Sequence, residues 1–364
     1  MASSANVEEQ DVVDRGHPST WIEVIETMNG FPFPELSSCR ELTERVPVGL
    51  GLFIVLPGGT TYYLLRRMVS SLFGGVFHGV QGFCTDTTNA GTYRAPEPGR
   101  QNHVAIKRSE LARMSRTQEE NVFREISVMR YLSQGAGHPY VMPLVGACMT
   151  RTHVYVVTPF YGGGDLLKKV VPDVGIEERI VRRWFRQILL GVGHIHSKGL
   201  CHHDLSPENI VISGSGDAAV VMDLGMVQRM PVDRDGNPVP MRDHQPFGKL
   251  RYMSPEIYNS QDYDGRQSDI WSVGVSLLVC LMGDYPWAAP TRLTVPERNI
   301  FSTDISHYRI FVERGAEVML QRMDLMPPRI CPEAVEFLCA ILTIDRDARP
   351  RSADLLAGHP FCLE

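Results

Sequence analysis

The stretch His202–Asn209 reads H-H-D-L-S-P-E-N and decides the fold. It predicts a catalytic loop, because Asp204 can accept a proton and the amide oxygen of Asn209 can hold a metal ion. A short apolar run follows the loop, and a second carboxylate stands further on, in Asp223-Leu224-Gly225. Two carboxylates and one amide on a strand–turn–strand are the parts that a phosphoryl-transfer site needs.

The composition is that of a soluble globular protein with one large or two smaller domains: 364 residues, 43% hydrophobic and 21% charged. The net charge of −6 gives no basic balance, so we expect neither nucleic acid nor a membrane surface as a partner. The eight cysteines are scattered, which predicts reduced thiols in a cytoplasmic or nuclear protein.

No targeting or membrane-spanning segment is expected. The N-terminus is polar and is no signal peptide. The most apolar run, Val46–Leu56, is shorter than the roughly 20 residues that span a bilayer. Its Val, Ile and Phe content predicts a buried strand.

The chain divides by composition and periodicity. Residues 1–20 predict a flexible tail, and residues 21–60 an N-terminal extension whose role the sequence does not define. Residues 61–160 carry predicted strands, interrupted by an inserted loop at 81–101, and residues 165–361 carry predicted helices. This order predicts an α+β fold with two lobes, a small β-rich N-lobe and a larger α-helical C-lobe.

Particular elements follow from the same patterns. Strands are predicted around a turn in 61–80, at 104–106 and within 140–157. Helices are predicted at 119–132, 179–196, 268–281 and 333–342. The helix at 268–281 is nearly all apolar, which predicts burial on every side.

The quoted stretch resembles the H-R-D-L-K-P-E-N loop of eukaryotic protein kinases of the Ser/Thr type, as a divergent member. Val104–Lys107 is similar to the V-A-I-K strand of that family, Asp223–Gly225 to D-F-G, and Ser254–Glu256 to A-P-E. The resemblance covers about residues 61–361. It implies a bilobal fold and transfer of the γ-phosphoryl group of ATP to a protein hydroxyl.

The resemblance also implies roles for the polar residues. Asp204 matches the catalytic base, and Asn209 and Asp223 match the two Mg²⁺ ligands. Lys107 matches the lysine that grips the α- and β-phosphates, and Glu125 the glutamate that holds it by an ion pair. These five occur in the family's order and at family-like spacing.

An adenine pocket is implied as well. The hinge of the family aligns with T-P-F-Y at 158–161, with Thr158 as the gatekeeper and Phe160 beside the adenine. The residues expected to sandwich the base are Val76, Ala105 and Val211. Plain core packing is an equal alternative for these apolar side chains.

Two further matches are structural by analogy with the family. Asp269 matches the buried aspartate that anchors the catalytic loop. Glu256 is expected to pair with Arg349.

The glycine-rich loop departs from the family pattern. Its key positions fall on Val69, Ser71, Phe73, Gly74 and Val76, where only the third glycine survives. Because glycines let the backbone approach phosphate closely, ATP is expected to bind weakly. A weak-binding active kinase and a pseudokinase, a nucleotide-binding or scaffolding module, are the competing interpretations. Activity is favoured because all five polar catalytic positions are filled, and the complete Ser-Pro-Glu segment disfavours a small-molecule kinase.

Control by activation-loop phosphorylation is not expected. His203 stands where most members have an arginine that meets the loop phosphate, and it is at most a weak, pH-dependent cation. Residues 226–247 contain no Ser, Thr or Tyr. The two absences agree.

The remaining departures are linked. Ser/Thr kinases have a lysine two residues after the base and a threonine after the loop glycine; here these positions hold Ser206 and, after Gly248, Lys249. Either Lys249 supplies the cation that the loop lost, or it is an exposed lysine that fills the position. Ser/Thr specificity is expected over Tyr. The sequence does not define the substrate, the regulator or the oligomeric state.

Overall fold

The computed structural model describes residues 30–46, 49–84, 93–94, 102–116, 121–235, 237–241, 248–287, 314–350 and 359–363. The predicted tail at 1–20 and the residues at 21–29 lie outside this part of the chain. The described residues form two compact units. The sheet unit comes from Glu35–Asn121 and Gly146–Val157, and the helical unit from residues 30–34, Val122–Val145 and Thr158–Glu364. An N-terminal sheet followed by helices agrees with the predicted α+β class.

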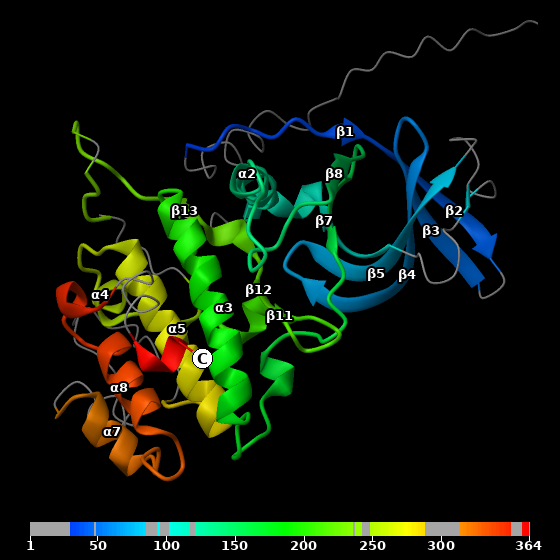
Figure 1. Cartoon of the computed structure of the whole chain (residues 1–364). Helices are drawn as coiled ribbons and strands as arrows, with labels where there is room; N and C mark the ends of the chain where they lie inside the picture. The colour runs from blue at the N-terminus through cyan, green and yellow to red at the C-terminus, as the bar shows by residue number, and fades with distance from the viewer. Residues whose placement is uncertain are drawn as a thin grey trace, which may run out of the picture. The chain divides into compact units, whose positions relative to one another are not determined.

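The sheet unit is one sheet with the strand order β1-β8-β9-β7-β5-β4-β3-β2, and β6 pairs with β5. Figure 1 labels β1 to β5, β7 and β8 of this sheet. Its strands are β1 (Ser37–Ser38), β2 (Arg40–Val46), β3 (Gly49–Val55), β4 (Thr60–Ser71), β5 (Gly74–Cys84), β6 (Tyr93–Arg94), β7 (His103–Glu110), β8 (Gly146–Met149) and β9 (His153–Pro159).

The two ends of this sheet meet. β1 pairs with β8 at one end of the order and β2 pairs with β3 at the other, yet only Cys39 separates β1 from β2. Glu41 of β2 accepts hydrogen bonds from Arg108 of β7, at 3.0 Å, and from the hydroxyl of Tyr155 of β9. A single extended segment therefore joins the two ends of the sheet and pairs with β8 and with β3, which would otherwise be exposed strands.

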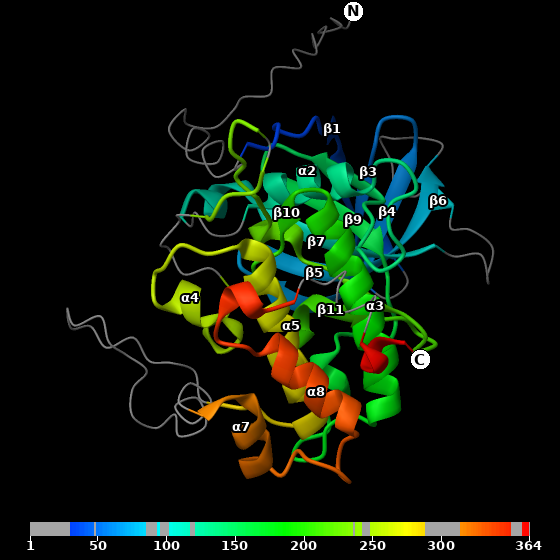
Figure 2. The same cartoon turned by 60° about the vertical axis from the view of Figure 1, so that its left-hand side comes forward.

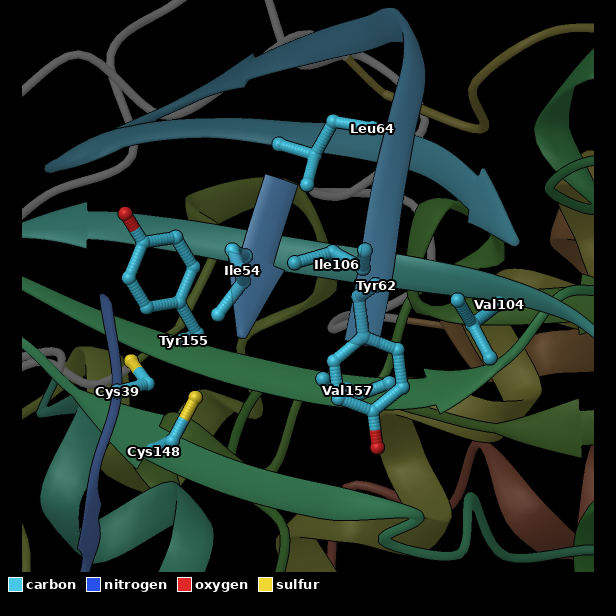
Figure 3. Packing of buried hydrophobic residues seen from close by; sticks show 9 residues of the cluster. All are labelled: Cys39, Ile54, Tyr62, Leu64, Val104, Ile106, Cys148, Tyr155 and Val157. Carbon is cyan, nitrogen blue, oxygen red and sulfur yellow. The ribbon is translucent and has the colours of Figure 1, made fainter. Parts of the chain in front are cut away.

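Apolar side chains fill the interior of the sheet unit (Figure 3). They come from β3, β4, β7, β8 and β9 and from Cys39 between β1 and β2, so alternating apolar positions of these strands form one core. The buried cluster consists of Cys39, Ile54, Tyr62, Leu64, Val104, Ile106, Cys148, Tyr155 and Val157.

The strand predictions are largely confirmed. The predicted pair around a turn is the β4–β5 hairpin, which is closed by a two-residue turn at Leu72–Phe73. The predicted loop at 81–101 is wrong at its start, because β5 continues to Cys84 and β6 adds to it. The strand carrying Lys107 extends to Glu110, further than predicted.

The boundary predicted at residue 61 does not coincide with an edge of the sheet. β1, β2 and β3 precede it and complete the same sheet. The predicted buried strand at 46–56 is β3, where Phe53, Ile54 and Val55 are buried.

The helical unit contains α2 (Val122–Leu132), α3 (Glu178–Ser197), α4 (Pro255–Tyr258), α5 (Gly265–Met282), α7 (Ala316–Arg322) and α8 (Pro332–Ile341). Two small strand pairs accompany the helices: β10 (Leu200–Cys201) with β13 (Gln228–Arg229), and β11 (Ile210–Ile212) with β12 (Ala219–Val221). The four helices that the periodicity predicts are all present, with ends shifted by at most three residues.

The apolar helix α5 lies between α3 and α8 (Figure 2). All of its residues except Arg266 and Met282 are buried, which confirms the prediction of burial on every side. Asp264 caps its N-terminus, where the carboxylate accepts the N–H of Arg266. Among the described residues no helix is both long and apolar enough to cross a bilayer.

The predicted pair of Glu256 and Arg349 forms in the interior of this unit. Nη1 of Arg349 lies 2.8 Å from Oε1 of Glu256, and both side chains are buried. Arg349 also donates to the carbonyl oxygens of Gln267 and Thr343. A buried pair with these extra hydrogen bonds fixes the segment after Ser254 against α5.

Candidate active site

The predicted catalytic loop is anchored by hydrogen bonds to a buried carboxylate. Asp269 of α5 accepts the backbone N–H groups of His202, at 2.7 Å, and His203, at 2.9 Å. Nε2 of His196, on α3, lies 2.9 Å from the same carboxylate. Although burial acts to raise the pKa of Asp269, the hydrogen bond and charge of His196 lower it more, so the group is ionised. This confirms the anchoring role expected for Asp269.

His203 turns the chain within the loop. Its backbone is left-handed, with φ of +64°. Its ring is buried and makes an edge contact with Tyr263, with 5.8 Å between the centroids. Burial lowers the pKa of His203 to about 4, against the opposing effect of Asp269. The imidazole is therefore neutral near pH 7 and is no substitute for the arginine of the family.

Gly248 packs against the same turn. Its φ is +80°, and a Cβ at this position would collide with the carbonyl oxygen of His203. Only glycine combines this backbone conformation with so close an approach. The next residue, Lys249, is thereby delivered to the catalytic loop.

Asp204 and Asn209 are joined directly. Nδ2 of Asn209 donates to Oδ2 of Asp204 at 2.6 Å and to its carbonyl oxygen at 2.7 Å. The pKa of Asp204 is raised, mainly by burial, while the charge of Lys249 acts to lower it. Because the amide nitrogen of Asn209 faces Asp204, its Oδ1 points to the other side.

Lys249 reaches both predicted partners. Its Nζ donates to Oγ of Ser206 at 2.7 Å and lies 3.4 Å from Oδ2 of Asp204. Ser206 is buried and the Lys249 side chain is 37% exposed, so the ammonium lies between the buried loop and solvent. Of the two alternatives for Lys249, this geometry favours the cation near the base over a lysine directed into solvent.

The β11–β12 pair brings Asp223 next to Asn209. Asp223 follows β12 with a left-handed backbone, and the N–H of the preceding Met222 donates to the carbonyl oxygen of Asn209 at 2.9 Å. The charge of Asp223 acts to raise the pKa of Asp204, an effect secondary to burial. The Oδ1 of Asn209 and the carboxylate of Asp223 are hard oxygen donors, so this pair fits Mg²⁺.

The predicted nucleotide residues of the sheet unit are neighbours on adjacent strands. Val76 of β5 pairs in register with Lys107 of β7 and with Val69 of β4. Ala105 precedes Lys107 by two residues on the same face of β7. A Cβ at Gly74 would collide with the carbonyl oxygen of Arg108, so packing of the sheet alone accounts for the one surviving glycine.

The other predicted nucleotide residues belong to the helical unit. Glu125 is buried on α2, Thr158 and Phe160 follow Val157 at the end of β9, and Val211 lies in β11. Lys107 and Glu125 are thus in different units. Their ion pair and the adenine sandwich stay predictions.

His202 and Arg124 contribute to the site although no sequence pattern predicts a role for them. Nδ1 of His202 accepts the N–H of Asp204 at 3.2 Å, and its Nε2 faces the carbonyl oxygen of Met222 at 3.0 Å. The buried Arg124 of α2 donates to the carbonyl oxygen of Gly225 at 2.8 Å. His202 belongs to the quoted motif and was visible there, whereas no local pattern marks Arg124.

The segment after Gly225 is ordered by its own hydrogen bonds. Val232 bridges to Pro238, and the carboxylate of Asp233 accepts the N–H groups of Asp235 and Asn237, each at 2.9 Å. Further along, Met241 exchanges two backbone hydrogen bonds with Tyr263. The described part of this segment therefore folds as a turn held by an aspartate.

This combination of an N-terminal sheet, a helical unit and a carboxylate-anchored loop is the one expected of a protein kinase domain. A model of the protein kinase domain matches residues 88–362. The chain therefore belongs to the protein kinase family.

The chain is similar to plant Ser/Thr kinases. It is 34% identical to CBL-interacting serine/threonine-protein kinase 26 of Arabidopsis thaliana over 182 residues, which are 50% of this chain and 39% of the relative. It is 31% identical to CBL-interacting serine/threonine-protein kinase 5 of the same plant over 232 residues, 63% and 45% of the two chains. It is 33% identical to serine/threonine-protein kinase SAPK3 of Oryza sativa subsp. indica over 178 residues, 47% and 48%. The matches thus span less than half of each relative's length.

The lowered pKa of His203 predicts a loss of stability in acid. Between pH 6.5 and 4, His203 is protonated in the unfolded chain but neutral in the folded chain. The free energy of unfolding therefore falls as the pH drops through this range. His203→Asn removes this proton and keeps a residue that tolerates the left-handed backbone. We expect the wild type to lose about 2 kcal/mol more than this variant between pH 7 and pH 5.

Urea denaturation of both proteins at several pH values measures this difference. The groups that act on His203, which include Asp269, His202, His196 and Arg124, are the same in both proteins. Parallel curves for the two proteins would show that His203 does not stay neutral through burial.

Proposed function

We propose that the chain is an active kinase that transfers the γ-phosphoryl group of ATP to Ser or Thr hydroxyls of protein substrates. The observation that carries the proposal is the contact network of Asp204 with Asn209 and Lys249, which orients one carboxylate and places a cation beside it. Kinship with plant Ser/Thr kinases supports the hydroxyl preference.

Asp204 is the proposed catalytic base. The hydrogen bond from Asn209 occupies Oδ2, which leaves Oδ1 to accept the proton of a substrate hydroxyl. Its pKa is raised, first by burial, which makes the carboxylate a stronger proton acceptor at neutral pH.

Asn209 and Asp223 would hold Mg²⁺. When bound, the ion neutralises charge on the phosphate oxygens of the nucleotide. The chain's own part is to fix the two ligands, through the β11–β12 pair and the hydrogen bond from Met222 to Asn209.

Lys249 is the proposed cation at the γ-phosphate. It comes from the segment after Gly248, and Ser206 accepts a hydrogen bond from its Nζ. Relative to the family pattern the lysine and the hydroxyl have exchanged positions, while both still meet next to the base. The charge at the site is thereby kept.

The nucleotide is expected to lie against residues of both units. Lys107 is proposed to grip its phosphates, with Glu125 as the partner of that lysine. The apolar and hinge residues proposed for ATP are Val69, Gly74, Val76, Ala105, Thr158, Phe160 and Val211.

A pseudokinase is the second candidate, and one observation favours it. Gly74 is required by the close approach of the Arg108 carbonyl, so the surviving glycine is no evidence for a phosphate-binding loop. A pseudokinase would bind nucleotide or a partner protein without turnover.

Turnover separates the two candidates. We expect wild-type protein to phosphorylate a peptide library at Ser or Thr, and Asp204→Asn to lose about 10²- to 10⁴-fold in kcat, because the base is gone. Asp217→Asn, at an exposed aspartate away from the loop, is the matched control and should keep full activity.

A thermal shift with ATP, with and without Mg²⁺, completes this test. Stabilisation by nucleotide without any phosphoryl transfer would establish the pseudokinase. Equal transfer by wild type and Asp204→Asn would show that Asp204 is not the base.

The role of Lys249 predicts a pH effect. Its ammonium acts to lower the raised pKa of Asp204, so its removal should raise that pKa further. The acid limb of the kcat profile, where Asp204 becomes protonated, should therefore move to higher pH in Lys249→Met, with kcat lowered roughly tenfold.

Two matched variants sharpen this prediction. Lys249→Arg keeps the charge and should keep the acid limb in place. The double variant Ser206→Lys with Lys249→Thr restores the family arrangement and should recover most of the activity. If Lys249→Met leaves both kcat and its pH profile unchanged, the lysine only fills a position.

We also propose that activity does not depend on activation-loop phosphorylation. The turn held by Asp233 orders the described part of this segment, and His203 is neutral. Treatment of active protein with a protein phosphatase should leave kcat unchanged. A loss of kcat on phosphatase treatment, with mass spectrometry that finds the removed phosphate between Asp223 and Glu256, would refute the proposal.

A further inference from the structure

Side chains on one face of α2 make hydrogen bonds and ring contacts within the helical unit. Arg124, Ser127 and Tyr131 are spaced by three and four residues and therefore lie on one face of the helix. Arg124 donates to the carbonyl oxygen of Gly225, directly after the Asp-Leu pair, at 2.8 Å. Oγ of Ser127 donates to the carbonyl oxygen of Pro32 at 2.7 Å.

The partner of Ser127 belongs to a short N-terminal stretch, Gly30–Pro34, which reads G-F-P-F-P and which we name the clamp segment. Phe31 is 5% exposed, and the ring of Phe33 lies 4.5 Å from that of Phe123 on α2. Its two prolines restrict the free chain, so less conformational entropy is lost when the segment docks. These contacts and the restricted backbone favour a single docked position of the segment against α2.

Arg229 connects the clamp segment and α2 to the catalytic loop. Its guanidinium carbon lies 4.2 Å from the ring centroid of Phe31 and 5.1 Å from that of Tyr131. One cation therefore contacts the ring of the clamp segment and the ring of α2. Arg229 is part of β13, which pairs with β10, and β10 runs directly into the loop at 202–209.

We propose that Phe31 and Arg229 are positioning residues of the kinase, and that the clamp segment is an intramolecular activator of α2. Through these contacts α2, and with it Glu125, is held against the strand pair that leads into the catalytic loop. The inference rests on the proposed function. Residues 226–247 have no hydroxyl side chain, so a phosphate on them cannot position α2. In this proposal the clamp segment positions α2 instead.

The test uses the whole chain of residues 1–364 and has two readouts. The first is steady-state kinetics with ATP and a peptide substrate. We expect Phe31→Ala and Arg229→Lys each to lower kcat roughly three- to tenfold, with KM for ATP changed less than about twofold, since the ring contacts order α2 and do not touch ATP. Lysine keeps the charge of arginine but not its planar stacking surface.

The second readout is hydrogen–deuterium exchange. In Phe31→Ala and Arg229→Lys, exchange should rise in Val122–Leu132 and at Gln228–Arg229, and stay unchanged in α5. Phe31→Tyr keeps the aromatic face and should restore both kcat and protection. Phe83→Ala, at a 50% exposed phenylalanine of β5, is the matched control and should behave as wild type.

The outcomes are distinct. Kinetics and exchange of Phe31→Ala and Arg229→Lys that match Phe83→Ala would overturn the proposal. Exchange that rises equally in α5 would reduce the clamp segment to general packing, which also overturns it. If the wild type shows no turnover, the proposed function fails, and the exchange of α2 in the variants alone decides whether the clamp segment holds the helix.

Discussion

The buried carboxylate of Asp269 is the constraint on which the catalytic loop depends. A buried charge must be matched by donors, and here two consecutive backbone N–H groups and the ring of His196 supply them. Two consecutive N–H groups can point at one carboxylate only if the chain turns sharply, which places His203 in the left-handed region. The turn sets the direction of Asp204 and leaves room only for a glycine at position 248.

The neutral His203 means that the cations of the site come from other elements. Lys249 lies beside Asp204, Arg124 of α2 donates to the carbonyl of Gly225, and Arg229 contacts two aromatic rings. In the family pattern a loop lysine supplies charge near the base and a loop arginine orders the following segment, and here these two tasks are divided among these residues. This division explains how a loop without its usual arginine and lysine can stay both oriented and charged.

Much of this was predictable, and the reason lies in the range of each interaction. The helices α3 and α5 follow from apolar periodicity, and the exchange of Ser206 with Lys249 was visible because both departures fall inside recognisable motifs. The joined ends of the sheet were not predictable, because Ser37 pairs with Cys148, more than a hundred positions away, and no local pattern encodes that register. The left-handed backbone of His203 and the contact of Arg229 with Phe31 are hidden for the same reason: each depends on a partner distant in sequence.

The residues that precede the family match at 88–362 belong to both folded units. Strand β1 pairs with β8 at one end of the sheet, and β3, itself paired with β2, pairs with β4 at the other. Without these strands, β8 and β4 would be unpaired edge strands, which can associate with other chains. The clamp segment covers the face of α2 that carries Ser127 and Tyr131. Residues 30–55 are therefore a structural part of this kinase: the segment outside the family pattern joins the two ends of the sheet and covers the helix that carries Glu125.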